Sequence, residues 1–246
     1  MVSAYLRRGM SAGLLAGLFA GLFAFFVGEP VLDRAIALEE SARAHGHEGG
    51  GHAHGGGGDE ETFSRTTQKV GLFFATGLFG VTVGGVFGIG YAFFRERLSA
   101  GSDFKRSISL TGAIFVGAFL IPFLKYPANP PSVGDPSTIR ERTAAYFTLV
   151  ALSLLAILLA WLAARTLKAR GVEALRRRLM VGASLVVAVG VLFLLLPAAP
   201  SDGGFPSGML WAFRLSSFGT QIAFWACLGL LFGVLCERAR RKGVTA

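Results

Sequence analysis

Residues 9–27 read GMSAGLLAGLFAGLFAFFV. The run carries no charged side chain, and at about 1.5 Å per helical residue it matches the ~30 Å hydrocarbon thickness of a bilayer. Glycine recurs at every fourth position, as Gly9, Gly13, Gly17 and Gly21, which leaves one ridge of the helix without side chains. The sequence therefore predicts a transmembrane helix here that packs closely against a neighbouring helix.

The rest of the chain has the same membrane-like composition. Of its 246 residues, 52% are hydrophobic and only 16% are charged, which excludes an ordinary soluble domain. A second glycine ridge occurs at Gly80, Gly84 and Gly88. The predicted fold is all-α, a polytopic membrane protein whose six-transmembrane-helix bundle forms one membrane domain over residues 1–246. The six helices are expected at about residues 9–27, 70–94, 107–124, 145–164, 179–196 and 209–235.

Lys and Arg residues are concentrated at the N-terminus, at the C-terminus and in alternate connections between these helices. Such residues are retained on the cytoplasmic side during membrane insertion. Both termini are therefore expected in the cytoplasm, and residues 29–69 are expected to form an external acidic and histidine-rich loop. The net charge of +9 reflects this asymmetry, so the expected contact is membrane lipid and not nucleic acid. The basic clusters are Arg7 and Arg8, Arg95 to Arg106, Arg165 to Arg178, and Arg238 to Lys242.

All histidines of the chain lie in one short glycine-rich segment of the predicted external loop. Imidazoles with a nearby carboxylate suit cobalt, nickel, zinc or copper and are unattractive to magnesium or calcium. A flexible glycine-rich segment can wrap such an ion, whereas the alternative is a solvated low-complexity linker. The predicted metal ligands are His45, His47, Glu48, His52 and His54.

An acidic segment follows the first predicted helix directly. Pro30 suits the first turn of a helix, so a break at Gly28 and a new short helix are expected. On that helix Glu29 and Asp33 are one turn apart, and we predict that they belong to a cation pathway or gate. The alternative is a solvated amphipathic connector.

Two further segments hold candidates for a pathway or gate. Lys125, Asn129 and Asp135 belong to a proline-rich, stiff loop that either positions polar ligands or caps the bundle, and Asp135-Pro136-Ser137 predicts the start of the next helix. In the last predicted helix, Arg214 is followed by Ser217 and Gln221. An arginine within a membrane helix is costly unless it faces protein or water, or snorkels to the interface. Its expected partners are the acidic residues Glu29, Asp33 and Asp135.

The chain has no phosphate-binding Walker motif, no His-Glu-x-x-His zinc motif and no serine elbow. An enzyme is therefore not expected, and no tightly bound cofactor is expected. A divalent metal, with cobalt, nickel or zinc as candidates, is expected as the substrate. Two functions remain open at this point: a metal permease or permease subunit, and a non-transporting membrane metal-binding sensor or metal-delivery subunit.

Three groups of motifs span nearly the whole chain. They are Gly28-Glu29-Pro30, then Lys125-Tyr126-Pro127-Ala128-Asn129-Pro130-Pro131 with Gly134-Asp135-Pro136, and finally Phe213-Arg214-Leu215 with Gly219-Thr220-Gln221. In these motifs the chain resembles the CbtA family, proposed subunits of a cobalt transporter in prokaryotes. The resemblance implies cobalt uptake across the cytoplasmic (inner) membrane, linked to cobalamin supply. A small one-span CbtB-like partner is implied as well, and further copies of the chain are another candidate partner. Family members are often described with five spans, whereas the hydrophobic pattern here gives six.

Overall fold

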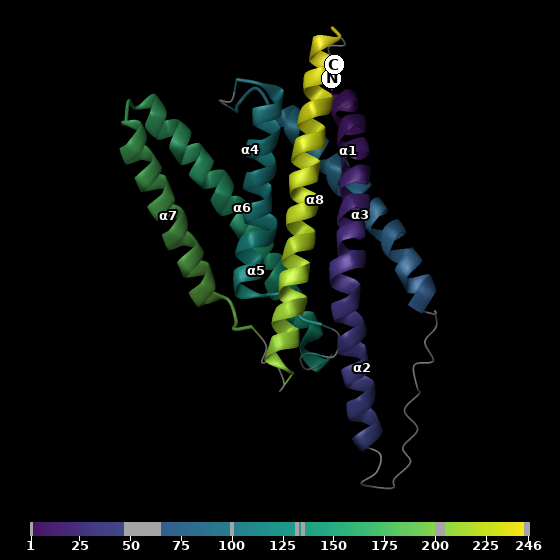
Figure 1. Cartoon of the computed structure of the whole chain (residues 1–246). Coiled ribbons are helices and arrows are strands. Elements are labelled where there is room, and N and C mark those ends of the chain that lie inside the picture. The colour runs from purple at the N-terminus through teal and green to yellow at the C-terminus, as the bar shows by residue number, and fades with distance from the viewer. Residues whose placement is uncertain are drawn as a thin grey trace. The chain divides into compact units, whose positions relative to one another are not determined.

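A computed structural model describes residues 2–46, 65–98, 101–130, 133, 136–199 and 205–243 (Figure 1). Every regular element within these ranges is helical, as predicted. The α-helices are α1 (Val2–Phe23), α2 (Glu29–Gly46), α3 (Arg65–Phe94), α4 (Asp103–Phe115), α5 (Ile121–Lys125), α6 (Ile139–Ala169), α7 (Ala174–Leu195) and α8 (Ser207–Arg241). Two π-helical turns, Ala24–Gly28 and Val116–Leu120, and one 3-10 turn, Pro136–Thr138, complete the described elements.

The described residues contain six helical spans long and apolar enough to cross a membrane, which confirms the predicted number. Each span begins before its predicted apolar run, because charged and amphipathic residues at its start continue the helical hydrogen bonding. Pro136–Thr138 leads directly into α6, so the predicted helix start at this proline is also confirmed. The spans are Val2–Leu38, Thr67–Phe94, Asp103–Lys125, Ile139–Ala169, Ala174–Leu195 and Ser207–Arg241.

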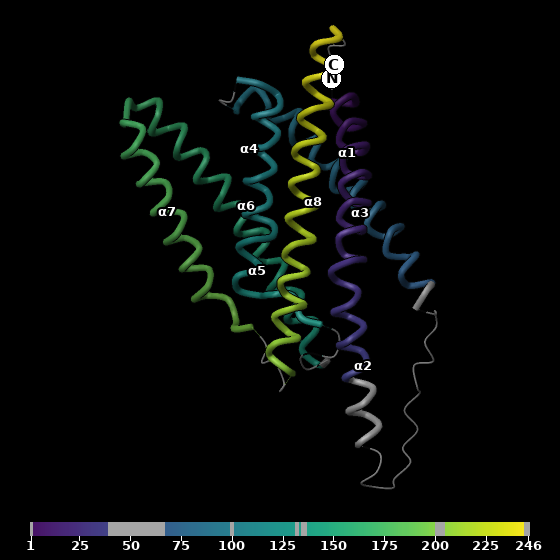
Figure 2. The backbone as a smooth tube through the Cα atoms, in the orientation of Figure 1, coloured from purple at the N-terminus to yellow at the C-terminus, as the bar shows by residue number. Residues whose placement is uncertain are grey.

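The break predicted at Gly28 was wrong, because the helix runs on from α1 into α2 (Figure 2). The connection is the π-helical turn Ala24–Gly28, in which the backbone N–H of Glu29 donates to the carbonyl of Ala24. Pro30 follows at once, and a proline in a helix lacks an N–H and crowds the preceding turn. The other π-helical turn likewise ends two residues before a proline, Pro122. Wider turns therefore accommodate prolines without ending the helices.

The chain forms two compact units. Unit 1 comprises residues 1–111, 129–132 and 205–246, and unit 2 comprises residues 112–128 and 133–204. Unit 1 contains α1, α2, α3, α8 and the first part of α4. The prediction that residues 1–246 form one membrane domain is not tested by this division into units.

The predicted glycine ridges form the centre of unit 1. α1 packs along α3 so closely that a Cβ atom on Gly13 would collide with the carbonyl oxygen of Gly80. A Cβ on Gly84 would collide in the same way with the carbonyl oxygen of Gly9. α8 also packs on α1, where the ring of Phe232 lies 6.5 Å from that of Tyr5. The sequence pattern thus predicted the tightest helix contact of this unit correctly.

Candidate functional site

The acidic pair at the start of α2 holds a lysine from α3. The ammonium group of Lys69 lies 3.0 Å from Asp33 Oδ2 and 4.0 Å from Glu29 Oε2. The Glu29 side chain is 13% exposed and that of Asp33 is 43% exposed, so the pair is accessible mainly through Asp33. Sequence analysis missed Lys69, which directly precedes an apolar run and looked like a helix-end charge. The structure therefore shows two predicted pathway carboxylates on one face, with a tethered cation between them.

Lys69 supplies the positive charge at this pair. Lys69→Met is expected to raise the affinity of the pair for Co²⁺ about fivefold at low salt, because a partly exposed charge contributes about 1 kcal/mol. The measurement is a calorimetric Co²⁺ titration of a protein whose four histidines are replaced by alanine. Lys105→Met, at an exposed site, serves as the control. An unchanged affinity after Lys69→Met would contradict this expectation, as would an equal rise in the control.

Arg214 and Asn129, two further pathway candidates, meet in unit 1. Arg214 Nη2 donates to Asn129 Oδ1 at 3.0 Å, across 85 positions of sequence. The guanidinium carbon also lies 5.5 Å from the ring centroid of Trp211. The contact with Asn129 was not among the acidic partners predicted for Arg214. This hydrogen bond connects α8 with the short segment that follows α5.

The polar residues predicted on α8 continue toward the C-terminus from Arg214. Ser217 and Gln221 are both half-buried. Gln221 Oε1 accepts a hydrogen bond from Trp225 Nε1 at 3.1 Å, one turn further along the same helix. This bond extends the polar face toward the middle of the membrane span.

Lys125 lies in unit 2, whereas the nearby Asn129 lies in unit 1. Its Nζ donates to the carbonyl oxygen of Phe193 at 2.7 Å, within the last turn of α7. The Tyr126 hydroxyl donates to the carbonyl oxygen of Pro197 at 2.7 Å, and burial raises the pKa of Tyr126, which keeps the phenol protonated. A cation at the C-terminus of a helix satisfies carbonyls that lack helical partners. These contacts support the structural alternative, a cap, for this part of the proline-rich loop.

Lys125→Met is expected to lower the free energy of unfolding by about 1.5–3 kcal/mol, the usual range for a hydrogen bond to a charged group. The effect is expected as a lower midpoint of thermal unfolding in detergent. Lys168→Met is the control, because Lys168 is exposed near the end of α6. Equal midpoints for the two variants would show that the cap does not stabilise unit 2.

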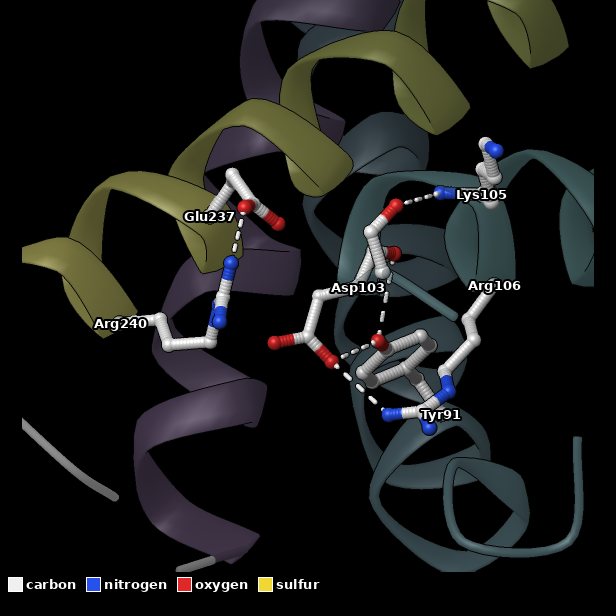
Figure 3. Close-up of polar contacts among 7 residues, drawn as sticks. Tyr91, Asp103, Lys105, Arg106, Glu237 and Arg240 are labelled. Carbon is white, nitrogen blue, oxygen red and sulfur yellow. Dashed lines mark hydrogen bonds and ion pairs between the residues drawn. The ribbon is translucent and has the colours of Figure 1, made fainter. Parts of the chain in front are cut away.

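A buried carboxylate begins α4 at the end of unit 1 where the chain starts and ends (Figure 1). Asp103 is 7% exposed, and its Oδ1 accepts a hydrogen bond from the Tyr91 hydroxyl at 2.8 Å. Arg106 Nη1 lies 3.5 Å from the same oxygen (Figure 3). Sequence analysis missed Asp103, because an acidic residue at a helix start within a basic loop is typical of a solvated cap. Its burial depends on Tyr91, a contact that no local pattern predicts.

This end of unit 1 is strongly basic. The guanidinium carbons of Arg8 and Arg95 lie 5.4 and 5.2 Å from the ring centroid of Tyr5. Arg240 pairs with Glu237 at 2.5 Å on the last turns of α8 (Figure 3). Arginines at helix ends are the residues that bind anionic lipid headgroups and remain on the cytoplasmic side.

Within the described ranges, no three His, Cys, Asp or Glu side chains come together as a metal site. Most of the predicted histidine site lies outside those ranges, and so does Asp135. His45 falls within α2, but its side chain is outside the described part. The capture role of His45, His47, Glu48, His52 and His54 therefore stays a prediction.

Comparison with known families gives one match over nearly the whole chain. The model of the family described as "Probable cobalt transporter subunit (CbtA)" matches residues 2–237. Neither the curated proteins nor the solved structures include a match.

Proposed function

This chain belongs to the CbtA family, and from that premise we propose that it carries cobalt into the cell as a permease or as the permease subunit of a complex. The protein is a multi-pass membrane protein, and its family is a class of transporter subunits, which is not an enzyme class. The observation that supports transport most directly is the acidic pair. Glu29 and Asp33 hold the ammonium group of Lys69, so the two carboxylates of the proposed path already have a positive charge beside them.

The proposed orientation is a prokaryotic inner membrane with both termini in the cytoplasm. α1 begins and α8 ends at the same basic end of unit 1 (Figure 1). The acidic pair lies beyond the other end of α1, on the side of the histidine-rich loop. In this orientation the histidines capture a divalent metal outside, and Glu29 and Asp33 receive it next.

The membrane potential supplies the driving force in this proposal. Two positive charges that cross 100 mV, inside negative, release about 4.6 kcal/mol. The chain carries no nucleotide-binding motif, so direct ATP coupling would need another subunit. The family description calls its members subunits, which implies a partner in a complex. We propose a small one-span CbtB-like protein for that role, and cobalamin supply as the use of the cobalt.

The test is uptake of radioactive cobalt by proteoliposomes that contain this chain alone, with nickel and zinc as competitors. Accumulation above protein-free liposomes would support a self-sufficient permease. Absence of flux, with cobalt still bound by the purified protein, would contradict the permease. It would favour the alternative of a membrane metal-binding sensor or metal-delivery subunit. The competitors rank the metals, since oxygen and imidazole ligands alone do not select cobalt.

A further inference from the structure

One face of α4 is lined with oxygen-bearing side chains inside unit 1. Asp103, Ser107 and Thr111 follow one another at four-residue intervals and are 7%, 0% and 4% exposed. Over this interval the helix rises about 12 Å, more than a third of the ~30 Å hydrocarbon core. Burying polar groups at such depth is costly, and in membrane proteins they commonly mark ion pathways.

The oxygen-bearing face of α4 packs against glycines of α8. Ser107 Oγ donates to the carbonyl oxygen of Gly229 at 2.8 Å. The hydroxyl oxygen of Thr111 stands 3.0 Å from the position that a Cβ atom would have on Gly229. One turn further along α8, a Cβ on Gly233 would lie 3.3 Å from Ser107 Cβ. We call this contact the α4–α8 seam, defined by Asp103, Ser107 and Thr111 on one side and Gly229 and Gly233 on the other.

Thr111 differs from other threonines in the membrane spans. Thr82 donates to the carbonyl of the residue four positions earlier, the usual arrangement in a membrane helix, and three more threonines do the same. Those three are Thr76, Thr166 and Thr220. The Thr111 hydroxyl is buried at the seam and makes no hydrogen bond with the described part of the chain. A buried hydroxyl without a partner costs about 1–3 kcal/mol, which a ligand at the seam would offset.

Polar residues of α8 lead from Arg214 toward the seam. From Gly229, α8 leads back at four-residue intervals through Trp225 and Gln221, which are hydrogen-bonded to each other, to Ser217. The rise from Arg214 to Gly233 is about 28 Å, close to the thickness of the hydrocarbon core. Because each four-residue step turns about 40° around the axis, these residues follow a spiral along α8, and α4 adds Asp103, Ser107 and Thr111 beside its Gly229 and Gly233 end.

We propose that Asp103, Ser107 and Thr111 line the cytoplasmic half of the cation path, with Asp103 as its last carboxylate before release. This inference rests on the proposed transport function and extends it to the exit from the membrane. The opposing glycines leave backbone carbonyls of α8 accessible to the ion. Oxygen ligands bind divalent transition metals more weakly than imidazoles do, which suits release after capture. The seam is closed here, because its hydroxyls contact Gly229 directly, so conduction requires α4 and α8 to separate.

The first test compares Thr111→Val with Thr82→Val in the proteoliposome assay of radioactive cobalt. Both changes remove a hydroxyl at nearly constant volume, but Thr82 is exposed on the surface of its span. Thr111→Val is expected to lower the initial rate about tenfold, the equivalent of one lost ligand contact. Thr111→Ser is expected to keep the rate, because it retains the hydroxyl, and Asp103→Asn is expected to lower it. Size-exclusion elution of each variant checks that it is folded.

The outcomes separate the two proposals. Wild-type flux with unchanged rates in Thr111→Val and Asp103→Asn would overturn the seam as a path and leave the transport function standing. Absence of wild-type flux would overturn the permease, and the seam as a cobalt path with it. Equal loss in Thr111→Val and Thr111→Ser would also overturn the inference, since it would show a packing defect and not a missing ligand.

A second readout measures water access without transport. Thr111→Cys and Thr82→Cys are made after Cys227 and Cys236 are replaced by alanine, and a charged thiol reagent is added from the side of the termini. Thr111→Cys is expected to react at least about tenfold faster than Thr82→Cys, because a path must admit water. Equal or slower reaction of Thr111→Cys would show a dry, static contact and overturn the inference.

Discussion

Gly84→Leu is expected to abolish the folded form of unit 1. A Cβ atom on Gly84 would collide with the carbonyl oxygen of Gly9 and would stand 2.7 Å from Gly13 Cα. The obstacle is the backbone of α1, which cannot turn away as a side chain can. Relief requires the two helices to move apart, and overpacking with extra methylenes where side chains can still adjust typically costs about 1–3 kcal/mol, occasionally more. Here the obstacle is backbone that cannot adjust, so the cost of a leucine is expected to exceed that range.

The control is Gly90→Leu on the same helix, where a Cβ atom would meet nothing within 4 Å. The measurement is the yield of monodisperse protein after detergent extraction, followed by its midpoint of thermal unfolding. Gly84→Leu is expected to give aggregated protein, and Gly90→Leu is expected to resemble the wild type. Equal behaviour of the two variants would contradict the close α1–α3 contact.

Arg214→Met is expected to lower cobalt uptake by about tenfold to a hundredfold. The change keeps an unbranched stem but removes the charge and the charge-assisted hydrogen bond to Asn129. Such a bond contributes about 1.5–3 kcal/mol. If it holds Arg214 in place beside the cation path, its loss corresponds to this range of rates. Initial rates in proteoliposomes, corrected for the amount of folded protein, provide the measurement.

Three further variants separate charge, geometry and general basicity. Arg214→Lys keeps the charge but not the planar group, so it is expected to recover only part of the rate. Asn129→Leu removes the other partner and is expected to resemble Arg214→Met. Arg238→Met, at an exposed position near the end of the same helix, is expected to leave the rate unchanged. Wild-type uptake by Arg214→Met would remove Arg214 from the path.

Features imposed by lipid could be predicted from sequence. The spans follow from apolar runs, and the contact between α1 and α3 follows from glycines at four-residue spacing, since small residues let membrane helices approach closely. The helical entrance to α6 at Pro136 was predicted for a similar local reason. Each of these features depends on neighbours within a few turns of one helix.

Features set by distant contacts could not be predicted. The π-helical turn at Ala24–Gly28 has the same hydropathy as an α-helix, so the sequence indicated a break where the helix continues. The bonds of Lys69 with Asp33 and of Arg214 with Asn129 each join segments far apart in the chain. The sequence around Asp103 is typical of a solvated helix cap, whereas in the structure the Tyr91 hydroxyl donates a hydrogen bond to its carboxylate. Local patterns therefore found most candidate residues but few of their partners.

We propose that this protein moves cobalt through the membrane and does not only bind it. The most direct measurement is the initial rate of radioactive cobalt uptake by proteoliposomes of the chain alone, with and without an inside-negative potential of about 100 mV. We predict uptake above protein-free liposomes that rises with the potential. Uptake that saturates at the amount of bound protein, and does not change with the potential, would contradict the claim.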